Sequence, residues 1–137
     1  MMKTHPVVPM VNFSEYVTDK KIDTRLPLVA NYSGAMINIS FQSVDINNKV
    51  VNFYAPVFKD IEYKLASPVQ DYVTSFLSQM PSNGNDEIMF SCNCILNFLY
   101  SELEGKKTGG IMGPITFGEI AYQLLNQTMA NIIITDI

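Results

Sequence analysis

A period-two alternation of apolar and polar side chains over residues 35–57 constrains the fold more than any other feature. Such alternation is typical of strands that bury one face. It is interrupted at Asp45, Asn47 and Asn48, residue types that tolerate the positive φ angles of tight turns. The pattern therefore predicts a β-hairpin with apolar positions Ile37, Ile39, Phe41, Val51, Phe53, Ala55 and Val57.

The clearest helical pattern covers residues 67–80. Apolar side chains fall at offsets 0, 3, 4, 7, 8 and 11 from Val69, which form one stripe along an α-helix. We expect Ser67 to cap this helix and Pro68 to occupy its first position, where a missing N–H is harmless.

Shorter elements follow. We expect a buried strand at 87–92, a helix at 94–104, and closing strands at 115–121 and 129–135. The apolar face of that helix would carry Ile95, Leu96, Leu99 and Leu103. The connection at 119–126 allows a helical turn or an irregular hairpin, of which we favour the hairpin.

The resulting order, β-β-α-β-α-β-β, predicts an α+β protein with a mostly antiparallel sheet and two helices packed on it. We expect residues 1–137 to form a single domain, since this length suits one core. Residues 1–34 are interpreted as an N-terminal extension with short extended pieces around 7–13 and 28–32.

Composition excludes several classes of function. The net charge is −4, and the nine basic residues form no stripe, which argues against nucleic acid as a partner. Apolar runs are too short to cross a bilayer, and the N-terminus lacks the apolar core of a signal peptide. We therefore expect a cytoplasmic protein. Only 16% of its residues are charged, which favours a homo-oligomer or a protein partner.

Cysteine and histidine are the residues to consider first for chemistry. Cys92 and Cys94 could contribute to a soft-metal site, but only His5, far away in sequence, could join them. We favour two free thiols buried among other small residues. A catalytic triad would depend on His5, which lies close to the terminus, so we expect no enzyme and no metal.

Three further motifs allow a functional and a structural interpretation. The glycines at 109, 110 and 113 lack the ending of a phosphate loop and are interpreted as a flexible loop. Glu119 follows Gly118 within an apolar stretch, so it could lie near a ligand or point to solvent. Residues 126–128 (Asn-Gln-Thr) could bind a ligand, although a turn is the simpler role.

Residues 113–120 (Gly-Pro-Ile-Thr-Phe-Gly-Glu-Ile) and 125–129 (Leu-Asn-Gln-Thr-Met) resemble the closing segment of FIST sensory domains. Residues 90–92 (Phe-Ser-Cys) are similar to an earlier step of the same domain, so the resemblance covers about residues 86 to 135. It departs from the family at Asn93-Cys94-Ile95, where an Arg is usual, and this chain lacks the family's large N-terminal domain.

The resemblance implies an intracellular signalling module that senses a small ligand. Amino acids have been suggested as ligands of that family, and some members bind haem. It also implies a set of ligand-binding positions: Glu119, Phe117, Gly118, Asn126, Gln127, Thr128 and Cys92.

Two functions therefore remain open. The first is a small-ligand sensor, which requires the closing strands to bring Glu119 and the amides at 126 and 127 beside Cys92. The second is a structural homo-oligomer without a ligand, for which three tyrosines that we expect to be exposed would suit an interface: Tyr16, Tyr32 and Tyr54.

Overall fold

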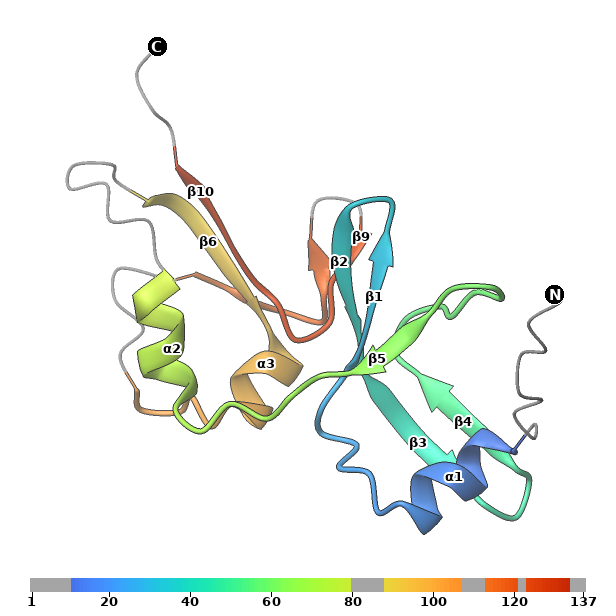
Figure 1. The fold of residues 1–137 in the computed structure, drawn as a ribbon. Coiled ribbons are helices and arrows are strands. Elements are labelled where there is room, and N and C mark those ends of the chain that lie inside the picture. Colours follow the sequence, from blue (N-terminus) through green and yellow to red (C-terminus); the bar gives the residue numbers. More distant parts are fainter. Residues whose placement is uncertain (1–10, 80–87, 107–112, 121–122, 134–137) are drawn as a thin grey trace, which may run out of the picture.

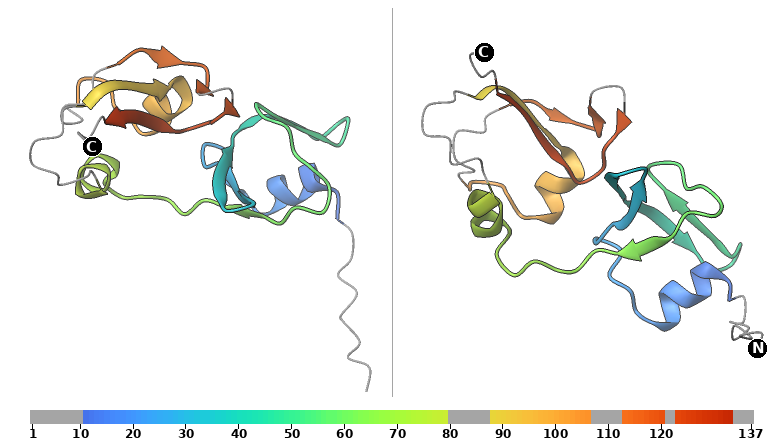
Figure 2. Two further views of the ribbon diagram at one scale, coloured as in Figure 1. Left: turned by 90° about the horizontal axis from the view of Figure 1, so that it is seen from above. Right: turned by 45° about the horizontal axis from the view of Figure 1, so that its top comes forward.

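The structure is a computed structural model that describes residues 11–79, 88–106, 113–120 and 123–133. The described residues form two lobes that lie side by side, joined by a linker at 66–71 (Figures 1 and 2). We call residues 11–65 the N-terminal lobe and the described residues from 72 onward the C-terminal lobe.

The N-terminal lobe contains one helix and five strands. They are α1 (Phe13–Asp19), β1 (Leu28–Tyr32), β2 (Ala35–Ile39), β3 (Phe41–Asp45), β4 (Val50–Phe53) and β5 (Tyr63–Leu65). Strand β1 is the centre of an antiparallel sheet of order β2-β1-β5, and β3 pairs with β4 in a separate hairpin.

The predicted hairpin is present, but it is shorter than expected. Strands β3 and β4 meet across the turn after Asp45, as the sequence indicates. The chain breaks its alternation at Ser40, however, and β2 pairs with β1 rather than continuing into β3. The backbone N–H of Ser40 donates to Asn126 Oδ1 at 3.1 Å, so a residue of the other lobe satisfies it.

Helix α1 was not expected, since Phe13 had been assigned to an extended piece. Asn12 caps the helix, because its Oδ1 accepts from the backbone N–H of Ser14 at 3.0 Å and of Glu15 at 3.4 Å. The helix packs on β3 and β4 and delivers Val17 to the core (Figure 1). That core consists of Val17, Leu28, Ile39, Phe41 and Ala55.

The C-terminal lobe contains two helices and five strands. They are α2 (Tyr72–Gln79), β6 (Ile88–Cys94), α3 (Ile95–Tyr100), β7 (Ile115–Thr116), β8 (Glu119–Ile120), β9 (Gln123–Leu124) and β10 (Met129–Ile133). Strand β6 is central in a sheet of order β10-β6-β7, antiparallel to β10 and parallel to β7. Strands β8 and β9 form the hairpin that we favoured.

Helix α2 begins later than its apolar stripe predicts. Asp71 is its cap: Oδ1 accepts from the backbone N–H of Thr74 at 3.0 Å and Oδ2 accepts from Thr74 Oγ1 at 2.7 Å. Asp and Ser are about equally good helix caps, but the negative charge of Asp71 also suits the positive end of the helix dipole. The helix starts at Tyr72, and residues 66–71 before it form the linker.

Helix α3 is also shorter than predicted, because it ends at Tyr100 rather than near residue 104. Leu96 and Leu103 are buried as expected, but Leu99 is 56% exposed. Once the helix stops, Leu103 is positioned by the turn that follows it, since its N–H donates to Phe98 O.

The α+β class and the mostly antiparallel pairing are confirmed. The described strands are divided among four small sheets rather than joined in one, and the described helices number three. Expected elements at 7–10, 87 and 134–135 and the glycines at 109 and 110 lie outside the described residues. No helix of the described segments is both long and apolar enough to cross a membrane.

Candidate functional site

The two lobes are held together by the turn at Asn126 and Gln127. Asn126 Oδ1 accepts from the Ser40 backbone N–H at 3.1 Å. Gln127 Nε2 donates to the Arg25 carbonyl oxygen at 2.8 Å and to Ser40 Oγ at 3.0 Å, and Asn38 Nδ2 donates to the Gln127 carbonyl at 3.4 Å. These polar contacts place one short turn of the C-terminal lobe against two segments of the N-terminal lobe, the loop at Arg25 and the stretch from Asn38 to Ser40.

A cavity of about 350 Å³ opens beside this turn. We call it the junction cleft, since side chains of both lobes and of the linker line it. Six of them carry the groups used below: Arg25, Asn38, Tyr72, Asn97, Tyr100 and Gln127. They supply three side-chain amides and two phenol rings, which is a mixture of adaptable hydrogen bonding and flat apolar surface.

A more open hollow of about 710 Å³ continues the cleft past the start of α2. The two share Val69, Tyr72, Tyr100 and Ser101 in their walls. Together the two cavities are large enough for a small molecule. One part of such a molecule would fit in the junction cleft, and the rest would extend through the open hollow toward solvent.

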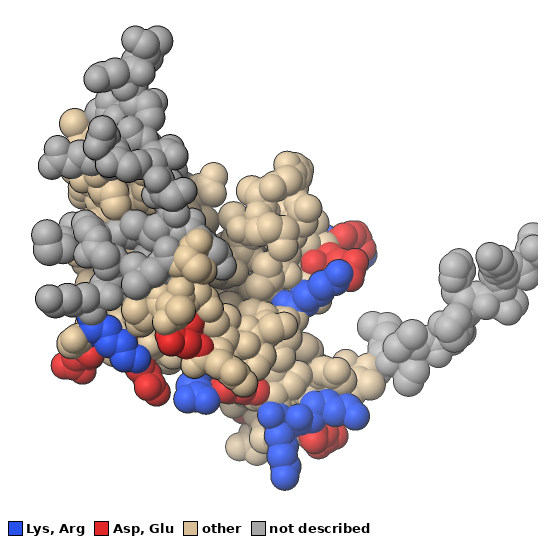
Figure 3. All heavy atoms as spheres, turned by 60° about the vertical axis from the view of Figure 1, so that its left-hand side comes forward, with Lys and Arg blue, Asp and Glu red and all other residues tan. Residues whose placement is uncertain are grey.

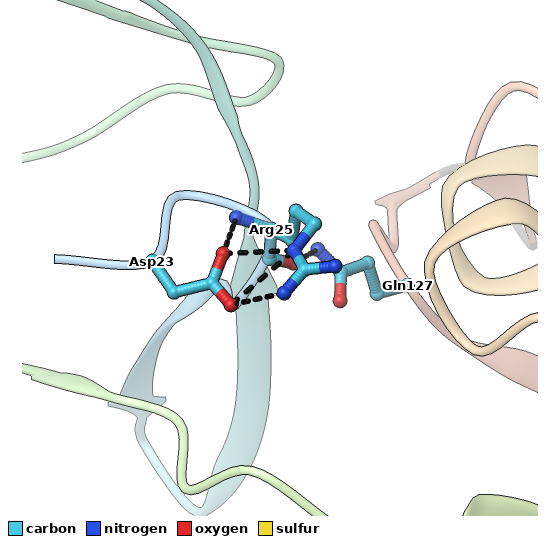
Figure 4. A network of polar contacts seen from close by, with 3 residues as sticks. All are labelled: Asp23, Arg25 and Gln127. Atoms are coloured by element: carbon cyan, nitrogen blue, oxygen red, sulfur yellow. Dashed lines mark hydrogen bonds and ion pairs between the residues drawn. The ribbon is translucent and has the colours of Figure 1, made fainter.

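Among the residues that line the junction cleft, Arg25 carries the positive charge, and Asp23 largely balances it. The guanidinium Nη2 lies 2.8 Å from Asp23 Oδ2 and Nε lies 3.0 Å from Oδ1 (Figure 4). The hydrogen bonds from Arg25 lower the pKa of Asp23, and the same contact raises the pKa of Arg25. Both side chains are exposed, at 68% and 42%, so the pair orients Arg25 more than it stabilises the fold.

The walls of the junction cleft and the open hollow, taken together, carry a slight negative charge. Three carboxylates (Asp23, Asp71 and Glu102) face two cations (Arg25 and Lys106), which leaves a net charge of −1. On the face drawn in Figure 3, acidic and basic side chains are interspersed and neutral surface covers most of the rest. A site of this kind gives no attraction to phosphates or other anions.

Asn97 is held rigidly at the bottom of the cleft. It is 2% exposed, its Nδ2 donates to Asn93 Oδ1 at 2.8 Å, and its Oδ1 accepts from Ser101 Oγ at 3.3 Å. Burial raises the pKa of Tyr72, while a hydrogen bond with Asn97 acts in the opposite direction. Tyr72 therefore contributes a neutral phenol whose position is set before any ligand arrives.

The structure brings together only part of the site expected from the sequence. Strand β6 places Cys92 opposite Ala130, and the Cys94 N–H donates to the Thr128 carbonyl at 3.0 Å. The 126–128 turn thus lies beside the thiol-bearing strand, as the sensor hypothesis requires. Of this turn only Gln127 lines the junction cleft.

Gly118 is also close to the turn. Its carbonyl accepts from the Leu125 N–H at 2.7 Å, its φ is +105°, and a Cβ there would lie 3.1 Å from Asn126 Nδ2. Asn126 is 1% exposed and its Nδ2 has no hydrogen-bond partner among the described residues. Gly118 therefore acts by leaving room for the Asn126 amide rather than by approaching a ligand.

Glu119 and Phe117 do not face the cleft. Glu119 is exposed, Phe117 is 79% exposed, and neither lines the junction cleft or either of two other cavities formed by described residues. The exposure of Glu119 agrees with the interpretation that it points to solvent, while residues 107–112 and 121–122 beside this stretch lie outside the described residues.

Cys92, one of the positions that the resemblance implies, is poorly placed to hold a haem. It is 6% exposed on the central strand β6 and lines none of these cavities. Within the described segments, no three His, Cys, Asp or Glu side chains gather as metal ligands either. Both cysteines are buried free thiols.

Most of the residues that line the cleft were missed by sequence reasoning. Asn38 had been interpreted as a polar member of an alternating strand, and Arg25 had not been singled out among the scattered basic residues. Asn97 offered a usable signal, because it is an amide inside the apolar run 95–100 (Ile-Leu-Asn-Phe-Leu-Tyr), where a buried polar group needs partners.

The fold and the cleft define a two-lobed α+β protein with a polar, small-molecule-sized cavity at the lobe junction. The chain belongs to the DUF6976 family, a family of unknown function whose model matches residues 9–135. No curated protein and no solved structure matches the chain.

Proposed function

We propose that this protein is a ligand-binding module of an intracellular signalling type, and that a small, uncharged, polar molecule binds in the junction cleft. One observation carries the proposal: amide and phenol groups from the N-terminal lobe, the start of α2, α3 and the 126–127 turn converge on one cavity of about 350 Å³. Such convergence is characteristic of small-molecule sites, which lie preferentially between domains or lobes.

The chemistry of the walls supports an uncharged ligand. Among the described residues, Gln127 Oε1 and Asn38 Oδ1 have no hydrogen-bond partner, so they can accept from hydroxyl or amide groups of a ligand. The Asn97 amide is already bonded to Asn93 and Ser101 and shapes the bottom of the cleft. The rings of Tyr72 and Tyr100 provide apolar surface for its ring or chain. In the junction cleft itself the charge of Arg25 is balanced by that of Asp23, and the adjoining open hollow has a net charge of −1 from Asp71, Glu102 and Lys106, so neither cavity favours an anion.

A bound ligand would be sensed through the lobe junction. Gln127 both lines the cleft and holds the Arg25 carbonyl at 2.8 Å, so a ligand touching Gln127 acts on a contact between the lobes. The ligand would shift the lobe arrangement only by its difference in affinity for the two arrangements. The similarity of residues 113–129 to FIST sensory domains supports this sensory role.

We place the module in the cytoplasm and assign it no catalysis. Two free thiols suit a reducing compartment. The same thiols, at 6% and 0% exposure for Cys92 and Cys94, are poorly placed to attack a substrate.

The test is a thermal-shift screen of matched uncharged and anionic metabolites, followed by calorimetric titration of the hits. We expect uncharged polar compounds to raise the melting temperature and anions to leave it unchanged. Tyr100→Ala should weaken binding at least tenfold, whereas Tyr54→Ala, a comparably exposed tyrosine outside the cleft (46% against 38%), should not. Equal effects of the two substitutions, or no hit at millimolar concentration, would remove the proposal.

The second candidate function is a structural homo-oligomer. It is favoured by the exposed apolar surface of the C-terminal sheet, where Phe90 (48% exposed) lies opposite Ile132 (54% exposed) on β6 and β10. Strand β10 is an edge strand, and edges with apolar side chains are prone to pair with another chain. Sedimentation velocity across a hundredfold concentration range decides this candidate, which fails if the protein stays monomeric throughout.

A further inference from the structure

We propose that the ligand of the junction cleft is a polyhydroxylated ring compound, such as a monosaccharide or a cyclitol. This inference rests on the proposed function, because it names the class of ligand for the same cavity of about 350 Å³. Three side chains that line the cleft carry polar groups that no hydrogen bond within the described residues uses: Gln127, Asn38 and Arg25. The groups that these side chains can still bind determine the class of ligand.

Gln127 offers an acceptor whose orientation is fixed. Its Nε2 donates to the Arg25 carbonyl oxygen at 2.8 Å and to Ser40 Oγ at 3.0 Å, which uses both of its protons. A carbonyl oxygen can only accept and an amide nitrogen can only donate, so these contacts decide which end of the amide is the nitrogen. The Oε1 atom is at the other end, where none of the described residues donates to it. It can therefore accept a proton from a ligand.

Asn38 adds a second amide with unused groups. Its Nδ2 donates to the Gln127 carbonyl oxygen at 3.4 Å, and no other described residue bonds to its side chain. Because Nδ2 has a second proton and Oδ1 has two lone pairs, Asn38 can still both donate and accept. A hydroxyl group matches both properties, since it has one proton to donate and two lone pairs. A ketone or an ether could only accept.

Arg25 supplies further donors beside these amides. Asp23 accepts from its Nε and Nη2, and none of the described residues accepts from its Nη1. In Figure 4 the Arg25 side chain lies between Asp23 and Gln127. Because Asp23 balances the charge of Arg25, the remaining N–H groups suit a neutral acceptor such as a hydroxyl oxygen. A ligand with several hydroxyl groups can accept from Arg25 and donate to Gln127 at the same time.

The phenol rings favour a ligand whose hydroxyl groups surround a ring. Tyr72 and Tyr100 line both the junction cleft and the open hollow, and Tyr100 is 38% exposed. A saturated ring has C–H groups on its faces and hydroxyl groups around its rim, so one face can pack on a phenol while the rim bonds to polar groups. Asp71 and Glu102 add acceptors in the open hollow, which a ligand with one polar end would not reach.

The test titrates the full chain with the methyl glycosides of glucose, mannose and galactose and with myo-inositol. The protein is labelled with nitrogen-15, so that nuclear magnetic resonance follows the side-chain amide signals of Asn38 and Gln127. We expect at least one compound to shift both signals saturably. Deoxyfluoro analogues of that compound carry a fluorine of similar size in place of one hydroxyl group and cannot donate there. At least one analogue should bind about fivefold more weakly, the value of one neutral hydrogen bond.

A matched pair of variants checks the location. Asn38→Ala removes one of the amides of the junction cleft, and Asn52→Ala removes an exposed amide on β4 that lines neither the cleft nor the open hollow. Asn38→Ala should weaken binding of the hydroxylated compound about fivefold, and Asn52→Ala should leave it unchanged. Circular dichroism confirms that each variant folds. If Asn38→Ala does not fold, the deoxyfluoro analogues on the wild-type protein decide alone.

Three results would overturn the inference. The first is that every deoxyfluoro analogue binds as tightly as its parent, and the second is equal binding to Asn38→Ala and Asn52→Ala. The third is that no hydroxylated compound binds while another uncharged compound does, with an affinity that Tyr100→Ala weakens. In that case the proposed function stands and only the class of ligand is wrong. If no uncharged compound of any class binds, the proposed function fails together with this inference.

Discussion

The two lobes bury different kinds of side chain. The N-terminal lobe encloses an apolar cluster, in which the Phe41 and Phe53 rings lie 5.1 Å apart and Phe13 stacks on both. The C-terminal lobe has buried Leu96, Leu103 and Ile120, but most of its other buried side chains are small or polar: Ser91, Cys92, Asn93, Cys94, Asn97 and Asn126.

This difference indicates that the two lobes are stabilised in different ways. Apolar burial is non-directional, so the apolar core makes the N-terminal lobe a stable platform, by which we mean a lobe whose fold does not depend on single polar contacts. Buried amides stabilise only when their partners are in place, so the C-terminal lobe depends on specific contacts such as Asn97 with Asn93. The lobe with the polar interior is therefore the one whose arrangement the proposed ligand would change.

The largest expected effect tests the platform. Phe41→Ala removes a ring that is 4% exposed and packed against Phe13 and Phe53. Truncation of a buried Phe typically lowers the free energy of unfolding by about 3–5 kcal/mol. Phe117→Ala, at 79% exposure, is the control and should change it by less than about 0.5 kcal/mol. Urea denaturation measures both, and similar values for the two would contradict an apolar platform.

The second effect tests the link between the lobes. Asn126→Ala leaves the buried Ser40 N–H without its acceptor, which should lower the free energy of unfolding by about 1–3 kcal/mol. Hydrogen exchange at the Ser40 amide should accelerate as well. Asn131→Ala on the exposed edge of β10 is the matched control. An unchanged Ser40 exchange rate would show that the contact does not hold the lobes together.

Several elements of both lobes follow from local patterns, and those were predicted correctly. The turn after Asp45, strand β6 and the β8–β9 hairpin depend on side chains that are neighbours in sequence. The start of α2 was misplaced, because Ser67 and Asp71 are both residue types that cap helices, and Asp71 is the one that accepts from the first turn in the structure. Helix α1 was missed because seven residues carry too little periodicity to reveal a short helix.

Local sequence patterns could not predict most of the candidate site. Arg25 and Gln127 meet across 102 residues of sequence, and Ser40 and Asn126 across 86. Nothing in the neighbours of Arg25 or Asn38 signals that contact. Gln127 was named for its place in a turn-forming motif, and it lines the cleft because that turn projects from the C-terminal lobe toward the other.

A smaller effect is expected at Gly118. Its φ of +105° strains any side chain, and a Cβ would also crowd Asn126 Nδ2 at 3.1 Å. Gly118→Ala should lower the free energy of unfolding by about 1–2 kcal/mol. Gly34, at φ +100° with nothing within 4 Å of its Cβ position, is the control for backbone strain alone. Equal costs for the two substitutions would mean that the contact with Asn126 has no energetic role.

The smallest effect concerns the ion pair of Asp23 and Arg25 at the mouth of the cleft. The hydrogen bonds from Arg25 lower the pKa of Asp23 below its ordinary value of 3.8, so the folded protein favours the ionised carboxylate more than the unfolded chain does. The contribution of Asp23 is therefore present above about pH 4 and is lost as the pH falls through the lowered pKa.

Asp23→Asn tests this assignment, because Asn cannot ionise. Its melting temperature should lie slightly below that of the wild-type protein at pH 7, and the gap should close as the pH falls below about 4 through the lowered pKa of Asp23. Since both side chains are exposed, 1 M salt should narrow the gap at pH 7 as well. Asn can still accept the hydrogen bond from the Arg25 backbone N–H, which measures 3.1 Å in the wild-type protein. The absence of any gap at pH 7 would therefore mean that Asp23 acts through this bond rather than through its charge.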